Sequence, residues 1–178
     1  EYLKNKKTKI IGLTGGQGSG KSTISNILKI ILKEHFHLET VIFSIDDFYK
    51  TFKERKIMSK KISPLFLTRG VPGTHNIRML QNCIQNIKKN KFKKMFIPKF
   101  DKSMDDRSSR NKWLKVKKKP NIVIFEGWCV GVTPQKNKDL NTPINKLEKD
   151  KDKKKVWRKK VNMEIENNYY KIFNLIDK

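Results

Sequence analysis

The sequence has no alanine, only two cysteines and no long apolar run. No stretch approaches the ~20 consecutive apolar residues that a membrane-spanning helix needs, so we expect a soluble protein. Cys83 and Cys129 lie far apart, which gives neither a zinc-binding spacing nor a disulfide framework and suits a reducing compartment. No apolar signal core stands near Glu1, which favours a cytoplasmic location, with a removed organelle-targeting segment as the alternative.

Acidic residues are also scarce, 17 against 42 basic ones, and the formal net charge is +25. Such an excess ordinarily points to nucleic acid or an anionic surface. Only six of the basic residues are arginine, whose planar fork suits phosphate, and lysine, isoleucine and asparagine abound. This pattern indicates a coding bias and solvated lysines. We therefore expect no specific nucleic-acid partner and no membrane partner.

The length of 178 residues suits one domain, residues 1–178, and its apolar residues cluster in short dense runs. Three of these runs, 9–14, 40–45 and 121–126, read as strands, the last with the continuous apolar character of a central parallel strand. Between the first two, apolar residues recur at helical spacing, which predicts the crossover helix of a parallel βαβ unit; they are Ile24, Ile27, Leu28 and Ile31. The fold class is therefore α/β.

The remaining segments are less regular. From 47 to 73 the chain is punctuated by proline and glycine and predicts a long irregular loop. Asn76 is a candidate N-cap for a helix whose apolar face is Ile77, Leu80, Ile84 and Ile87. Residues 95–100 predict an edge strand. Residues 133–160 are polar, Lys- and Asn-rich and without period, which predicts a mobile insertion.

Helical spacing returns near the end of the chain; its apolar face is Ile165, Tyr169, Ile172, Phe173 and Ile176. A doubly wound sheet seldom ends after three central strands. We therefore expect the natural protein to continue beyond a domain that lacks its C-terminal part. The sequence does not indicate an oligomeric state.

A glycine-rich loop after the first strand carries the clearest motif, G-x-x-x-x-G-K-[ST]. The candidate nucleotide-binding residues are Gly15, Gly16, Gln17, Gly18, Ser19, Gly20, Lys21, Ser22 and Thr23. Glycines here let backbone N–H groups converge on phosphate oxygens at a helix N-terminus. Lys21 would reach the β- and γ-phosphates and Ser22 would ligate Mg²⁺. The motif predicts ATP and Mg²⁺ as cofactors.

Carboxylates follow two of the strands, where open α/β sheets place their ligands. Asp46, with Asp47 beside it, comes after the second strand and could accept the proton of an attacking hydroxyl. Glu126 ends the third strand, a place suited to supporting Mg²⁺. The alternatives are that the aspartates cap a helix or are solvated, and that Glu126 is a buried structural carboxylate. Lys21, Asp46 and Glu126 are the candidate catalytic residues, and Ser22 and Glu126 the candidate metal ligands.

These motifs together resemble the P-loop small-molecule kinases that include uridine kinase, pantothenate kinase and phosphoribulokinase. Within that group the chain resembles the D-glycerate 3-kinase family through blocks that occur in order: the P-loop with Asp46-Asp47-Phe48-Tyr49, then 69–75, then 98–102 with 106–107, then 126–131. The resemblance implies a three-layer P-loop NTPase-type fold with a doubly wound, mostly parallel sheet. It also implies phosphorylation of the 3-hydroxyl of D-glycerate by MgATP, with Asp46 as the general base.

A small anionic substrate would suit a cleft that holds several cations. The candidate substrate-binding residues are Arg69, His75, Lys99, Lys102 and Arg107, to which the resemblance adds Asp47, Tyr49 and Asp101. The alternatives are the same chemistry on a uridine- or pantothenate-like metabolite, a non-catalytic nucleotide-binding regulator and a basic module that binds RNA. The retention of Lys21, Ser22, Asp46 and Glu126 speaks against a regulator. The lack of a basic patch interleaved with aromatics speaks against RNA.

Overall fold

The computed structural model describes residues 7–177, so both ends of the predicted domain, 1–6 and 178, lie outside the described residues. The helices and strands follow one another as β1 (Lys9–Thr14), α1 (Lys21–Phe36), β2 (Thr40–Ser44), α2 (Phe52–Lys61), α3 (Ile77–Lys88), β3 (Met95–Ile97), β4 (Phe100–Asp101), β5 (Asp106–Arg107), β6 (Leu114–Val116), β7 (Ile122–Gly127), α4 (Lys146–Lys151), α5 (Val156–Glu164) and α6 (Tyr170–Phe173). Short 3₁₀ turns are η1 (Ile45–Phe48), η2 (Pro64–Leu67), η3 (Arg110–Lys112) and η4 (Asp139–Asn141), and a π-helical turn, η5 (Ile165–Tyr169), joins α5 to α6.

The central sheet consists of three parallel strands in the order β1-β7-β2. Val123 of β7 is level with Ile10 on one side and Val41 on the other. The predicted strands are confirmed to within one residue. β1 and β2 are parallel, as the predicted βαβ unit requires. They are not neighbours, because β7 lies between them. β7 is the most buried strand because it pairs on both edges, as its continuous apolar run predicted.

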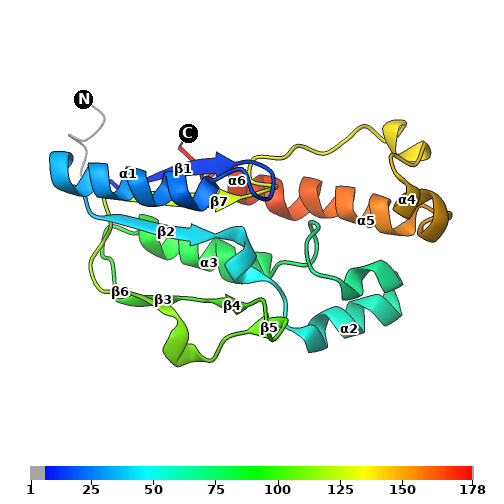
Figure 1. The fold of residues 1–178 in the computed structure, drawn as a ribbon, viewed down its shortest axis with the longest axis horizontal. Coiled ribbons are helices and arrows are strands. Elements are labelled where there is room, and N and C mark those ends of the chain that lie inside the picture. Colours follow the sequence, from blue (N-terminus) through cyan, green and yellow to red (C-terminus); the bar gives the residue numbers. More distant parts are fainter. Residues whose placement is uncertain (1–6, 178) are drawn as a thin grey trace.

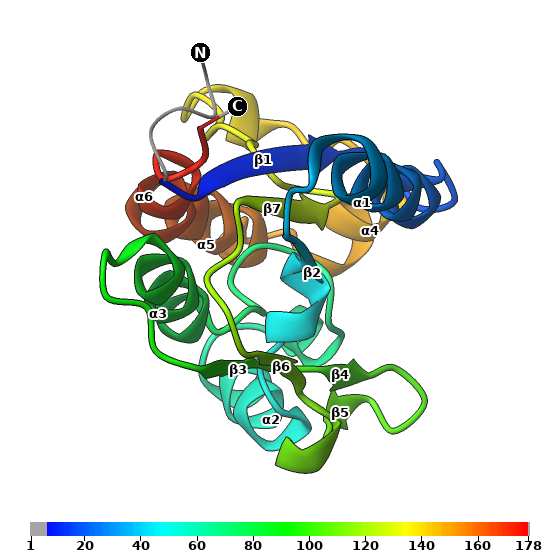
Figure 2. The same cartoon turned by 90° about the vertical axis from the view of Figure 1, so that its left-hand side faces the viewer.

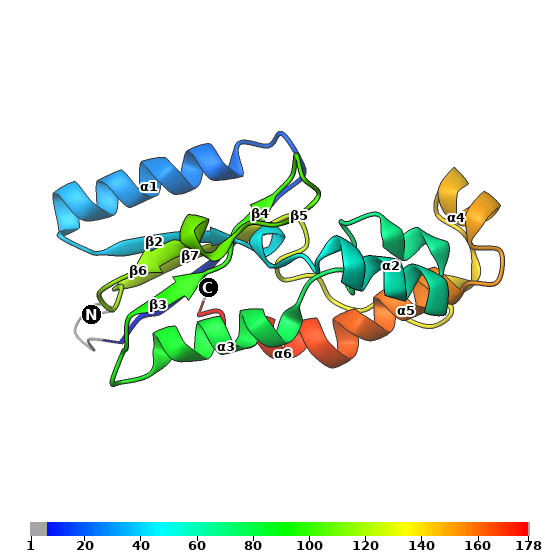
Figure 3. The same cartoon turned by 90° about the horizontal axis from the view of Figure 1, so that it is seen from below.

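Helices cover both faces of this sheet. α1 lies on one face, and α3, α5 and α6 lie on the other (Figures 1 and 2). The predicted α/β class with a three-layer, parallel arrangement is confirmed. Beyond the carboxyl ends of the strands, α2 lies on one side and α4, next to the beginning of α5, lies on the other (Figures 1 and 3). Among residues 7–177 no helix is long and apolar enough to cross a membrane.

The core lies between the sheet and the helices of the second face. Leu80, Ile84 and Ile87 of α3 are fully buried there, and Tyr169 and Ile172 join them from the C-terminal helix. Asn76 caps α3 as predicted, because its side-chain Oδ1 accepts a hydrogen bond from the Met79 N–H at 3.0 Å. Both predicted helices of this face are therefore confirmed, although Ile77 and Phe173 of the predicted apolar faces are only partly buried and Ile176 lies beyond the end of α6.

α1 is confirmed as a helix, but its apolar face is largely uncovered. Ile24, Ile27, Leu28 and Ile31 are between 37 and 51% exposed, and Ser25 is the buried residue of the helix. Periodicity predicts that a helix has an apolar face. It does not predict that the described part of the chain covers that face.

The expectation of an irregular segment from 47 to 73 is wrong, since this segment contains α2 and η2. α2 begins with a capping box: the Thr51 hydroxyl accepts from the Glu54 N–H, and the Glu54 carboxylate accepts from the Thr51 N–H. The T-x-x-E signature was readable in the sequence. The helix itself was not predicted because it has few apolar residues and therefore shows no apolar periodicity.

The predicted edge strand at 95–100 becomes part of two small antiparallel pairs. β3 pairs with β6, and β4 pairs with β5. Pro98 separates β3 from β4, as expected for a residue without a backbone donor. The β4–β5 hairpin carries residues 102–105 toward the carboxyl end of the central sheet.

The expectation of a mobile, structureless insertion at 133–160 is also wrong. The segment contains η4, α4 and most of α5, and an ion pair rather than an apolar core holds it together. The buried Arg158 contacts Asp152 at 3.2 Å and donates to the Leu140 carbonyl at 2.7 Å. Composition did not reveal this because the buried groups are charged and satisfy one another.

Candidate active site

The phosphate-binding loop joins β1 to α1 with the backbone that its glycines permit. Gly18 and Gly20 have φ of 76° and 81°, the left-handed region that favours glycine. A Cβ on Gly16, Gly18 or Gly20 would meet no atom within 4 Å, so the concave side of the loop is open. Gly20 precedes the first turn of α1, whose N–H groups and dipole favour an anion there.

The polar side chains of the loop lie beside the end of β7. The Lys21 ammonium donates to the Gly16 carbonyl at 2.6 Å and so folds back across the loop. The Ser22 hydroxyl is 3.5 Å from a carboxylate oxygen of Glu126. β1 and β7 are adjacent, so their carboxyl ends bring these groups together. Thr23 stands exposed in the first turn of α1.

The two aspartates after β2 lie in η1 and have different surroundings. Asp47 is buried and accepts from the Ser44 N–H at 3.2 Å, which closes a capping box with the Ser44 hydroxyl. Its carboxylate also pairs with Lys99 at 2.9 Å. Asp46 faces the other way and pairs with Lys102 at 2.9 Å. Of the two, only Asp46 lines a cavity.

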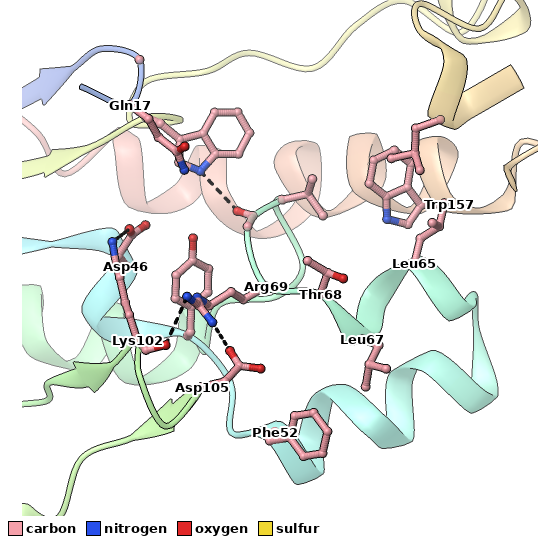
Figure 4. Close-up of a pocket in the computed structure, with 16 residues that line it drawn as sticks. Gln17, Asp46, Phe52, Leu65, Leu67, Thr68, Arg69, Lys102, Asp105 and Trp157 are labelled. Carbon is pink, nitrogen blue, oxygen red and sulfur yellow. Dashed lines mark hydrogen bonds and ion pairs between the residues drawn. The ribbon is translucent and has the colours of Figure 1, made fainter. Parts of the chain in front are cut away.

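That cavity has a volume of about 1070 Å³ and is lined by the phosphate-binding loop and by residues of α2, η2, α4 and α5 (Figure 4). One end is polar and contains predicted residues of the site: Gly16, Gln17, Asp46, Tyr49, Arg69 and Lys102. The side of the cavity away from Asp46 is mostly apolar and contains Phe52, Leu65, Leu67 and Trp157 (Figure 4), and Val71 and Leu147 also line the cavity. The cavity therefore joins a charged region next to the P-loop with an apolar region lined by the α2–η2 hairpin and by α4 and α5.

His75, predicted to touch substrate, is fully buried and does not line the cavity. Its ring stacks on Tyr49 with centroids 4.4 Å apart, and its Nδ1 is 2.6 Å from the Tyr169 hydroxyl. Burial lowers the pKa of His75 to about 3, a shift that the charge of Asp46 partly offsets and that of Lys50 increases. The ring is therefore neutral and belongs to the packing behind the site.

Tyr49 stands between this packing and the cavity. Burial raises the pKa of its hydroxyl well above the ordinary range, and the charge of Asp46 and a hydrogen bond to it raise it further. The phenol therefore stays protonated beside the Asp46 carboxylate. It is a neutral donor, not a base.

Three other predicted substrate residues hold the backbone around the cavity and do not line it. Asp101 accepts from the Ser103 and Met104 N–H groups and shapes the β4–β5 hairpin. Arg107 donates to the Tyr49 carbonyl at 3.1 Å. Lys99 pairs with Asp47, as described above. The sequence predicted that these three side chains bind substrate. In the structure each contacts another group of the protein.

Several residues of the cavity were not predicted. Trp128 lies in a quoted motif, and its indole N–H donates to the Gly70 carbonyl at 3.3 Å, yet the motif assigned it no role. Trp157 and Leu147 lie in the segment expected to be structureless. Asp105 gave no signal beyond its charge. Only the tertiary fold brings these residues to one cavity.

Comparison with known proteins agrees with this geometry. The model of the Phosphoribulokinase / Uridine kinase family matches residues 10–158. The chain is 39% identical over 132 residues to the "Uncharacterized kinase mug58" of Schizosaccharomyces pombe, covering 70% of this chain and 47% of that protein. It is 29% identical over 133 residues to the chloroplastic D-glycerate 3-kinase of Arabidopsis thaliana, covering 70% of this chain and 29% of that one. The chain thus spans less than half the length of these relatives.

Among solved structures, the D-glycerate 3-kinase from Cryptococcus neoformans superposes with a TM-score of 0.78 at 25% identity, covering 96% of this chain and 62% of that one. The structure of the YGR205w protein matches with a TM-score of 0.67 at 33% identity, covering 78% of this chain and 52% of that one. Because the family match extends over most of the chain, the protein belongs to the Phosphoribulokinase / Uridine kinase family.

Proposed function

We propose that this protein is a kinase that transfers the γ-phosphoryl group of MgATP to a hydroxyl of a small metabolite, with D-glycerate as the first candidate. The observation that carries the proposal is the position of Asp46. Its carboxylate lies in a cavity that the P-loop residues Gly16 and Gln17 border and that also contains the cations of Arg69 and Lys102. A base, a phosphate loop and two cations thus share one space.

The loop suits a nucleotide triphosphate. Its open glycine backbone and the N-terminus of α1 would hold phosphate oxygens, and Lys21 would exchange the Gly16 carbonyl for the β- and γ-phosphates. Ser22 and Glu126 supply oxygen ligands close to one another. This suits Mg²⁺, which keeps several waters and takes phosphate oxygens; when bound, it would neutralise phosphate charge.

The acceptor hydroxyl would lie at Asp46. This carboxylate pairs with Lys102 at 2.9 Å, and it would accept the proton of the attacking hydroxyl. Arg69 would bind the carboxylate of an acid substrate, and Lys102, whose side chain is 63% exposed, is free to turn from Asp46 toward an incoming anion. A small hydroxy acid has both groups that this end of the cavity would recognise.

D-glycerate in particular is supported by the ordered motif blocks and by the D-glycerate 3-kinases among the relatives. A second candidate is a larger acceptor, such as a uridine- or pantothenate-like compound. The apolar end of the cavity favours it, because Phe52, Leu67 and Trp157 would contact more of such a molecule than of a three-carbon acid.

The test is a coupled ADP-release assay with purified protein, MgATP and D-glycerate, with uridine and pantothenate in parallel. Glycerate-dependent ADP release supports the first candidate. Turnover of uridine or pantothenate without glycerate turnover supports the second. ATP binding without ADP release from any of the three would contradict both, and ATP binding is therefore measured in the same samples.

A further inference from the structure

Asp105 lies at the wall of the cavity in an unusual backbone conformation. Its φ is 50°, in the left-handed region, where aspartate and asparagine are tolerated better than other non-glycine residues. It closes the β4–β5 hairpin, and its two carboxylate oxygens contact two different arginines. One oxygen pairs with Arg55 at 2.9 Å, and the other accepts from Arg69. The carboxylate therefore bridges a buried cation and a cavity cation.

Arg55 is the buried partner, with no exposed surface. Beyond the Asp105 carboxylate, its guanidinium and Nε donate to three carbonyls, those of Leu67 at 2.6 Å, Asp105 at 2.6 Å and Lys50 at 3.2 Å. A buried charge with this many partners is fixed in place, because moving it would leave several polar groups unsatisfied. Arg55 thus fixes the position of Asp105 through both the backbone and the side chain.

Arg69 is the cavity partner, and Figure 4 shows it directed toward Asp105 and toward the Lys102 backbone. Its Nη1 donates to the Asp105 carboxylate, and its Nη2 is 3.5 Å from the Lys102 carbonyl. The guanidinium also lies over the Phe100 ring, 5.5 Å from its centroid. A guanidinium has five N–H donors, so these contacts orient the group and leave donors for a ligand.

We propose that Asp105 is a positioning residue that holds the Arg69 guanidinium at the polar wall of the acceptor cavity, with the buried Arg55 as its anchor. A long, solvated arginine would otherwise lose side-chain entropy on binding an acceptor carboxylate, and Asp105 removes part of this cost beforehand. The role of Arg69 toward an acid substrate rests on the proposed function. The contact between Asp105 and Arg69 does not.

The charge of Asp105 supports this arrangement. Burial raises the pKa of the carboxyl, but hydrogen bonds and charges from Arg55 and Arg69 outweigh it and leave the pKa below its ordinary value. The carboxylate is therefore ionised at neutral pH. Asp105→Asn removes the charge and keeps both the shape and the tolerance for the left-handed backbone.

The first experiment measures KM and kcat for Asp105→Asn with the acceptor that the wild type uses best among glycerate, pantothenate and uridine. With a carboxylate acceptor we expect the acceptor KM to rise about tenfold or more, while the KM for ATP and kcat stay within about threefold. In an Arg69→Gln background, Asp105→Asn should change the acceptor KM little. Asp106→Asn is the matched control, because the Asp106 side chain bonds the neighbouring Arg107 N–H and does not line the cavity.

The second experiment is a thermal-unfolding cycle of Asp105→Asn, Arg69→Gln and the double variant, which needs no substrate. Non-additive shifts in Tm are expected. Additive shifts would overturn the proposal, as would an unchanged acceptor KM in an enzyme that turns over a carboxylate acceptor. If only uridine is turned over, the proposal of an acid acceptor fails, and the unfolding cycle alone decides whether Asp105 positions Arg69.

Discussion

The adjacent residues Asp46 and Asp47 of η1 have different roles: Asp47 stabilises the turn, and Asp46 is the proposed base. Asp47 caps the 3₁₀ turn and pairs with Lys99, and its Oδ2 accepts both hydrogen bonds. Asp46 reaches the cavity and has the exposed Lys102 as its partner. Successive residues point in different directions in a tight turn, which gives neighbours of identical chemistry different environments.

Asp46→Asn should reduce turnover by on the order of 10²–10⁴ and leave ATP binding nearly intact, because the amide cannot accept a proton from the acceptor hydroxyl. Steady-state kinetics and ATP titration measure the two effects. Asp47→Asn is the matched control and should lower Tm while keeping most of kcat. Near-full activity of Asp46→Asn would contradict the assignment of Asp46 as the base.

His75 makes stability depend on pH. Its folded pKa of about 3 lies below the ordinary 6.5, so between these values the unfolded chain binds a proton that the folded protein does not. Stability therefore rises with pH through this window and falls as the solution is acidified, by at most about 1.4 kcal/mol per pH unit.

Urea unfolding of wild type and His75→Gln at a series of pH values between 4 and 7 measures this dependence. His75→Gln should be less stable at pH 7, because it loses the stacking on Tyr49, and its stability should fall less steeply on acidification. Carboxylates titrate in both proteins, so the difference between the two curves isolates the histidine. Parallel curves would show that the ring is not held neutral.

At the scale of elements, α2 shows how polar local signals replace apolar periodicity. The buried residue of this helix is Arg55, and Phe52 lines the cavity. The helix has no apolar stripe. Its beginning is determined by the Thr51–Glu54 capping box, and its position by the carbonyls that Arg55 binds. In α2 a buried arginine with its hydrogen-bond partners thus fixes the helix in the fold, as buried leucines do in other helices.

Thr51→Ala should destabilise the protein by about 1 kcal/mol, because the Glu54 N–H loses its side-chain acceptor. Urea unfolding measures the loss. Ser59→Ala is the control, because Ser59 lies half-buried in the same helix and its hydroxyl donates to the Lys56 carbonyl without capping the helix; it should stay within about 0.5 kcal/mol. Equal effects of the two substitutions would mean that the cap does not define the start of α2.

At the scale of the whole molecule, the charge of +25 is spread over the surface. The lysine run at 117–119 follows β6, and the run at 153–155 follows α4, at opposite ends of the long axis (Figure 1). Such separated runs attract polyanions without forming a single track that would recognise one sequence.

RNA binding should therefore be non-specific and should weaken steeply between ~50 and ~200 mM salt through counterion release. Fluorescence anisotropy with two RNAs of equal length and unrelated sequence measures it, and the two should behave alike. Retention of one RNA but not the other at the higher salt would revive the RNA-binding alternative.

The sequence by itself determined the parts of this protein whose signals are local. Apolar runs predicted β1, β2 and β7, apolar periodicity and a cap predicted α3, and glycine spacing predicted the phosphate-binding loop. In each case the residues determine the conformation of their own backbone or of residues close to them in sequence.

The tertiary structure decided what depends on contacts between distant segments. It placed β7 between β1 and β2, buried His75 and put the charges of Lys99 and Arg107 to use within the protein. It also brought Trp157 and Asp105 to the cavity. The sequence does not show whether a charged side chain contacts solvent, a ligand or a buried partner. The free-energy differences among these environments come from the groups around the side chain in the folded protein.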